Sequence, residues 1–165
     1  MNKKADKIKL YNALKERLIR ESRSDLLRFT LSTMPTFRPA DFHRRYYHVL
    51  TDFADGKIRK LMVFMPPQHG KSEGSTRRLP AFLMGQNPDK KLAIVSYNAP
   101  KARKFNREIQ RIIDSPEYHD IFPNTALNAS NVTTVAGSWL RNADECEIVG
   151  YRGGFKTVGV GGALT

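Results

Sequence analysis

The stretch of sequence that decides the fold is LMVFMPPQHGKSE, residues 61–73. It opens with a short continuous apolar run, Leu61 to Met65, whose length is typical of a buried parallel strand rather than of a helix. Pro66 and Pro67 cannot continue that strand, because proline has no backbone N–H to donate to a neighbouring strand. A helix is predicted from about residue 71 to residue 84. The segment is therefore expected to form a strand, a turn and a helix in direct succession.

The turn ends in Gly70, Lys71 and Ser72, and each of them has a use in binding phosphate. Gly70 lets the backbone approach an anion closely, and the first N–H groups of the helix attract it. Lys71 is expected to reach the β- and γ-phosphates of ATP as the catalytic residue, and Ser72 to hold Mg²⁺ through its hydroxyl. We therefore predict that ATP and Mg²⁺ are bound by Pro67, Gln68, His69, Gly70, Lys71, Ser72 and Glu73.

This segment departs from the usual phosphate-loop pattern, G-x-x-x-x-G-K-S/T, at one point. The first glycine of the pattern falls at Met65. Because Gly-Lys-Ser also occurs by chance, the prediction depends on the expected order of strand, turn and helix. The alternative is a solvent-exposed turn in which Lys71 is an ordinary surface lysine.

Further strands and helices are predicted on both sides of the turn. Residues 92–97 are interpreted as a buried strand and residues 99–114 as a helix, an alternation typical of parallel α/β sheets. Asp41 is interpreted as the N-cap of a helix that runs to about residue 54 and ends at Asp55-Gly56, where glycine suits a left-handed conformation. We expect an α/β fold in which helices flank a parallel sheet.

The two ends of the chain give weaker patterns. Residues 6–28 are predicted to be helical with a break near Ser24 and Asp25, and residues 30–39 to be a connector. Short strands are expected at residues 132–135, 138–141 and 147–149, and residues 155–165 are glycine-rich, like the approach to another core strand.

The charge of the chain favours a polyanionic partner. The net charge is +12, and residues 1–60 carry 15 basic and 7 acidic side chains, whereas residues 61–165 carry 13 and 9. Such an excess is typical of proteins that contact nucleic acid phosphates, although a solubilising surface is the alternative. At 40% hydrophobic and 27% charged residues, the composition excludes collagen and an acidic disordered chain.

The compartment is expected to be the cytoplasm, with no membrane contact. No run approaches the roughly 18–20 apolar residues that span a bilayer, and the N-terminus lacks the apolar core of a signal peptide. The lone Cys146 excludes an internal disulfide and a cysteine-based structural zinc site.

Residues 60–73 resemble the variant Walker A segment of the large terminase subunits of tailed phages. Residues 79–89 resemble the helix and turn that follow it in that family, and residues 93–98 resemble its next strand. Further matches are Phe105, Arg107, Ile112, Ile113, Ser115, Tyr118, Phe122, Pro123 and the glycine-rich residues 159–165.

The resemblance covers residues 36–165 and implies a P-loop NTPase domain of the RecA-like (ASCE) class, incomplete here, with residues 1–35 as a basic helical N-terminal arm. It also implies an ATP-driven motor that packages double-stranded DNA into a preformed capsid. The implied partners are a small terminase subunit and the capsid portal, with the motor as a homo-oligomer. Many members have arginine at the position of Gln68, so an arginine acting on the γ-phosphate would have to come from elsewhere, such as Arg77, Arg78 or a neighbouring subunit. Both arginines are otherwise expected to be surface residues of the helix.

A phosphate-loop ATPase also needs an acidic residue after an apolar strand to hold Mg²⁺, and a carboxylate to orient the attacking water. No four apolar residues followed by Asp or Glu occur after Ser72. In the resembled family this Walker B motif begins shortly after the position of Thr165. We therefore expect a truncated N-terminal segment, without the nuclease domain, that binds nucleotide weakly and does not hydrolyse it.

Three further interpretations come from the residues. Phe37 and His43 precede the loop and could contact the adenine, Phe37 by stacking on it and His43 at its edge. The alternative is a helix that packs His43 and Phe42 into the core or against the linker. The helix over residues 99–114 has a basic side that could contact DNA backbone: Lys101, Arg103, Lys104, Arg107 and Arg111. The alternatives to a packaging motor are another P-loop enzyme, such as a superfamily-2 helicase or a kinase, and a non-enzymatic basic nucleic-acid-binding module.

Overall fold

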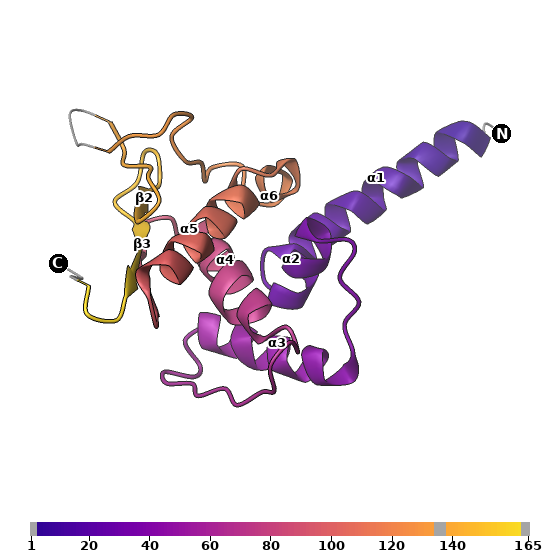
Figure 1. Cartoon of the computed structure of the whole chain (residues 1–165). Coiled ribbons are helices and arrows are strands. Elements are labelled where there is room, and N and C mark those ends of the chain that lie inside the picture. The colour runs from indigo at the N-terminus through magenta and orange to yellow at the C-terminus, as the bar shows by residue number, and fades with distance from the viewer. Residues whose placement is uncertain (1–2, 134–137, 163–165) are drawn as a thin grey trace.

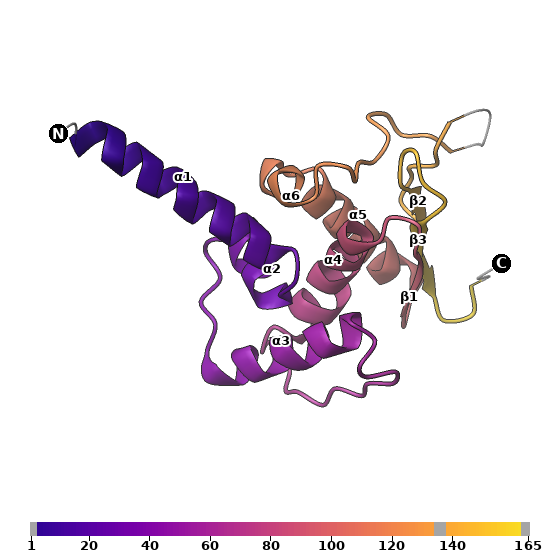
Figure 2. The same cartoon turned by 180° about the vertical axis from the view of Figure 1, so that it is seen from behind.

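The computed structural model of the chain describes residues 3–133 and 138–162 (Figure 1). Its elements are α1 (Lys3–Ser22), α2 (Leu26–Thr33), α3 (Asp41–Ala54), the π-helix η1 (Glu73–Arg78), α4 (Leu79–Gln86), β1 (Lys91–Ser96), α5 (Ala99–Ile113), α6 (Pro116–Ile121), β2 (Glu145–Glu147) and β3 (Gly154–Gly159). The fold is mixed α/β, as predicted, with a small sheet at one side and α1 projecting from the other (Figures 1 and 2).

An aromatic cluster forms the centre of the helical part. Phe29 of α2 lies with its ring centroid 5.5 Å from Phe82 of α4, 5.9 Å from Tyr118 of α6 and 6.0 Å from Phe122. The side chains of Phe29, Phe82 and Tyr118 are fully buried. The Tyr118 hydroxyl donates a hydrogen bond of 3.0 Å to the carbonyl of Ala81, so its polar atom is satisfied inside the core.

The N-terminal helices divide as the sequence predicts. Asp25 caps α2 by accepting a hydrogen bond of 2.8 Å from the backbone N–H of Arg28, which confirms the break at this point. Helix α2 continues to Thr33, so the connector predicted over residues 30–39 is wrong for its first four residues. Thr30 is buried there and donates to the carbonyl of Leu26. In α1, by contrast, residues 6–18 are exposed.

The sheet has three strands in the order β1-β3-β2, and it is mixed rather than parallel. β1 and β3 are parallel, with Leu92 opposite Phe155 and Ile94 opposite Thr157. β2 is antiparallel to β3, because the two strands are joined by a short connection that contains Gly150 at φ 82°. The prediction of a purely parallel sheet is therefore wrong for β2.

Helix α5 packs against β1 and β3 on one side and against η1 and α4 on the other. The opposite face of β1 is open in the described part of the chain, since Lys91, Ala93 and Val95 are exposed. In the described part of the chain, helices therefore cover one face of this strand.

The strand predicted over residues 61–65 is wrong. These residues have no regular secondary structure, and they do not pair with any strand in the described part of the chain. Leu61, Val63 and Met65 pack against the core, whereas Met62 and Phe64 are 79% and 87% exposed. The run therefore has the alternating burial of an extended segment with one face covered, not the double-sided burial of a central strand.

The remaining strands differ in place from their predicted positions. Val132 forms an isolated antiparallel bridge with Arg141, while residues 134–135 of the first predicted strand lie outside the described residues. The third predicted strand, at residues 147–149, occurs two residues earlier as β2, and the glycine-rich end begins with β3, with residues 163–165 outside the described part. Within that part, every helix is too short or too polar to cross a membrane.

Replacing Phe29 by alanine should lower the free energy of unfolding by about 3–5 kcal/mol, because it leaves a cavity among three aromatic rings. Urea denaturation measures this value. The matched control is Phe64→Ala, which removes an equally large but exposed ring and should change stability by less than about 0.5 kcal/mol. Equal losses in the two variants would contradict the packing described here.

Cys146 in β2 should react with a disulfide reagent such as Ellman's reagent only when the fold opens. The side chain is fully buried, and burial raises the pKa of its thiol to about 12. Since the thiolate is the reacting form, the rate at pH 8 should be at least ~100-fold slower than in the urea-unfolded chain. A rate close to that of the unfolded chain would show that β2 is not held against β3.

Candidate functional site

The turn before η1 has an unusual backbone. Gln68 has φ 63° and Gly70 has φ 75°, and His69 lies between them without a positive φ. Among the described residues, Gln68 is the one non-glycine residue in the left-handed region. A glutamine there is strained relative to ordinary conformations, and such strain is often found at functional sites.

The backbone N–H groups of this turn are left without acceptors. The first helical hydrogen bond runs from Gly74 N to Gly70 O, at 3.2 Å. Within the described residues, the N–H groups from Gln68 to Glu73 have no backbone or side-chain acceptor. These are consecutive donors at the start of a helix, and Pro66 to His69 are exposed to solvent.

Two side chains of the predicted site lie beside these donors. The Lys71 ammonium donates to the carbonyl of Met65 at 3.1 Å, so the side chain folds back over the turn. The hydroxyl of Ser72 has no hydrogen-bond partner in the part of the chain that the structure describes. Both groups therefore remain available: the lysine can exchange one carbonyl for a stronger anionic acceptor, and the serine oxygen is free to coordinate a cation.

Helix α3 holds the turn from behind. Ala40 N donates to His43 Nδ1 at 3.1 Å, which places the proton of the neutral imidazole on Nε2, and Nε2 lies 3.2 Å from the carbonyl of His69. The Tyr46 hydroxyl donates to the carbonyl of Lys71 at 2.8 Å. A side chain at Gly70 would place its Cβ 3.0 Å from His43 Nε2, so the turn and the helix are in close contact.

Of the two upstream candidates, His43 contacts the predicted loop, and Phe37 packs beside His43. The Phe37 ring packs edge-on to His43 with centroids 5.2 Å apart, and it also packs against Tyr47 and the core. The adenine contact expected of Phe37 stays a prediction. His43 contacts the backbone of the loop, a role that was not predicted for it.

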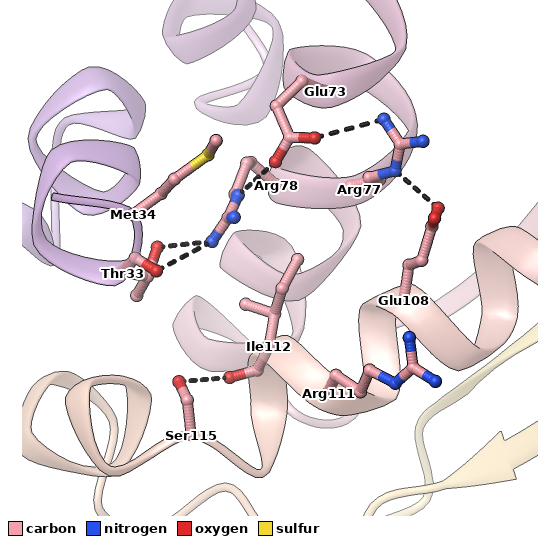
Figure 3. Close-up of a pocket in the computed structure, with 9 residues that line it drawn as sticks. All are labelled: Thr33, Met34, Glu73, Arg77, Arg78, Glu108, Arg111, Ile112 and Ser115. Atoms are coloured by element: carbon pink, nitrogen blue, oxygen red, sulfur yellow. Dashed lines mark hydrogen bonds and ion pairs between the residues drawn. The ribbon is translucent and has the colours of Figure 1, made fainter. Parts of the chain in front are cut away.

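Glu73 is held by arginines rather than left free (Figure 3). It accepts from Arg78 Nε at 2.7 Å and from Arg77 Nη1 at 3.1 Å, and Arg77 also binds Glu108 of α5. Arg78 is buried and donates to the hydroxyl of Thr33 at 2.8 Å. The expectation of a surface residue is therefore wrong for Arg78, whereas Arg77 is partly exposed and held by the carboxylates of Glu73 and Glu108.

This network lines a pocket of about 460 Å³ between α2, η1 and α5, which includes Glu73 but neither Lys71 nor Ser72 (Figure 3). The predicted site residues are thus divided. Gln68 to Ser72 form the exposed turn, whereas the Glu73 carboxylate belongs to the interior network. No group of three or more His, Cys, Asp or Glu side chains suited to a metal occurs among the residues described.

The contacts between α3 and the turn could not be recognised from the sequence. His43 and Tyr46 are 26 and 25 residues from their partners in the turn, and no local pattern links them. The available signal was the aromatic and histidine content of residues 37–48, which indicated a packed helix but not what it packs against.

Comparison with family models, with curated proteins and with solved structures finds no match to this chain.

Replacing Tyr46 by phenylalanine should lower the free energy of unfolding by about 0.5–1.5 kcal/mol and loosen the turn. The loss stays modest because Ser75 also donates to the carbonyl of Lys71. Hydrogen exchange should show faster exchange of the Gly74 N–H, which makes the first helical bond. Tyr11→Phe on exposed α1 is the control and should change neither quantity. Unchanged exchange at Gly74 in Tyr46→Phe would contradict the role of α3.

Proposed function

We propose that residues 67–72 bind the phosphates of ATP, and that the chain is the nucleotide-binding segment of a DNA-packaging motor of the large terminase subunit type. The observation that carries the proposal is the series of unpaired N–H groups from Gln68 to Glu73. Consecutive donors in which left-handed and other conformations alternate form a concave anion-binding nest, and a helix dipole behind it adds to the attraction.

The side chains around the turn fit a triphosphate with its metal. Lys71 would exchange the carbonyl of Met65 for the β- and γ-phosphates, where a charge-assisted hydrogen bond is stronger. Ser72 has the free hydroxyl that a Mg²⁺ ion accompanying the nucleotide would use. Bound Mg²⁺ would neutralise phosphate charge, while the chain itself contributes N–H donors, an ammonium group and one oxygen.

The same contacts favour binding without turnover by this chain. The carboxylate nearest to Ser72 in sequence is Glu73, and it is occupied by Arg77 and Arg78. A carboxylate whose oxygens already accept hydrogen bonds from two guanidinium groups is not free to orient an attacking water. We therefore expect ATP to bind and to remain intact.

The motor assignment depends on the resemblance of residues 36–165 together with the net charge of +12. Under this assignment the motor moves double-stranded DNA, and its partners are a small terminase subunit and a capsid portal. Further copies of the chain form the oligomer, and the compartment is the cytoplasm. A superfamily-2 helicase or a kinase would share the phosphate loop. A basic nucleic-acid-binding module would not need it, and would bind DNA without binding ATP.

Lys71→Ala should weaken binding of a fluorescent ATP analogue in the presence of Mg²⁺ by roughly 10–100-fold, the value of one or two charge-assisted hydrogen bonds. Fluorescence titration measures the dissociation constant. Lys60→Ala removes an exposed lysine just before the segment and is the matched control, expected to leave affinity unchanged. If Lys71→Ala bound the analogue as tightly as the unmodified chain, the phosphate-loop assignment would be wrong.

A further inference from the structure

Helix α5 has a basic, solvent-facing side because its apolar residues lie on the opposite side and pack into the core. Phe105, Ile109 and Ile113 are buried, so the arginines between them face outward. Asn98 caps the helix by accepting from Lys101 N at 2.9 Å. Four residues separate Arg107 from Arg111, so both lie on the same side of the helix, about one turn apart.

Most of the basic residues on α5 have partners. Arg103 pairs with Asp144 at 2.8 Å, Lys104 lies 4.0 Å from Glu108, and Lys101 lies over the ring of Phe105. Arg107 and Arg111 differ, because both are exposed and neither has an ion pair or hydrogen bond with any described residue. In Figure 3 Arg111 lies below Glu108 at the edge of the Glu73 and Arg77 network, and no dashed line joins its guanidinium to the residues drawn.

These two arginines form one wall of a second pocket, of about 350 Å³, which we call the α5 pocket. Its other lining residues come from α5 and its C-terminal end, from residues 131 and 133, and from residues 141–143: Gln110, Asp114, Asn131, Thr133, Arg141, Asn142 and Ala143. The pocket thus combines amide and hydroxyl groups with three arginines and a single carboxylate.

That carboxylate is already neutralised. Asp114 accepts two hydrogen bonds from the guanidinium of Arg141, which also donates to Gln110 Oε1 at 3.2 Å and to the carbonyl of Asn128. Arg141 is largely buried and serves as a fixed wall. The charge that remains unpaired in the α5 pocket is therefore that of Arg107 and Arg111.

We propose that the α5 pocket binds the phosphate groups of a nucleic acid backbone, with Arg107 and Arg111 as the residues that contact them. Arginine, asparagine, glutamine and threonine are among the side chains that contact backbone phosphates, and such contacts position a polymer without reading its sequence. The unpaired positive charge excludes a cationic ligand.

A polymer fits this site better than a free phosphate. The two arginines are open to solvent along one side of a helix, an arrangement that suits successive phosphates rather than one enclosed anion. The inference rests on the proposed function, because it gives the contact site for the DNA that a packaging motor would move. It does not depend on any contact made by the turn at Gly70. The two proposals can therefore fail separately.

The test is fluorescence anisotropy of a labelled duplex DNA titrated with the full chain at several salt concentrations. Each phosphate contact contributes about 0.9 to the slope of log affinity against log salt. The double variant Arg107→Ala/Arg111→Ala should lower the magnitude of this slope by about 2 and weaken affinity at 0.1 M salt by roughly 10–60-fold. Its circular dichroism and its affinity for the ATP analogue should stay unchanged.

The matched control is Arg44→Ala/Arg45→Ala, which removes the same charge from exposed positions of α3. It should change affinity less than about threefold. Equal losses in both double variants, or no loss in either, would overturn the proposal, since binding would then follow net charge or use another surface. Displacement of the duplex by inorganic phosphate, beyond the effect of sodium chloride at equal ionic strength, would assign the pocket to a free phosphate and also overturn it.

Discussion

The structure depends on the contact between α3 and the turn that precedes η1. His43 and Tyr46 supply donors to the carbonyls of His69 and Lys71, so the carbonyl side of the turn is satisfied from within the protein. The N–H side is left to solvent or to a ligand. A backbone N–H without an acceptor costs free energy only when it is removed from water, so these donors are tolerated while the turn is exposed. A bound anion would supply them with acceptors and stabilise the turn further.

The same helix start connects the turn to the rest of the chain. Glu73, Arg77 and Glu108 join η1 to α5, and Arg78 joins η1 to α2. The π-helical winding of residues 73–78 accompanies this network, and such winding is often found at functional sites. Arg107 and Arg111 lie on the same helix, α5, whose Glu108 forms the ion pair with Arg77 of η1.

Local signals were sufficient to predict most of the helices and β1. The helix predicted to follow an Asp41 N-cap ends at Ala54 as expected, and Gly56 has the left-handed φ of 77° expected after it, but the N-cap is Ala40 and Asp41 is the first helical residue. Strand pairing is not local, and here prediction from sequence was limited. The apolar run at residues 61–65 has no pairing partner in the described chain, and its Met62 and Phe64 lie in solvent. In the site, Gly70, Lys71 and Ser72 were identified from their pattern, whereas the roles of His43 and Arg78 depend on contacts 26 and 45 residues away.

The most direct measurement is a titration of the isotopically labelled chain with ATP and Mg²⁺, followed by nuclear magnetic resonance of the backbone amides. The account predicts that the largest shifts fall on the N–H groups from Gln68 to Glu73, because these donors are unpaired before the ligand binds. Shifts that leave these amides unchanged, or that centre on another part of the chain, would contradict a phosphate-binding turn.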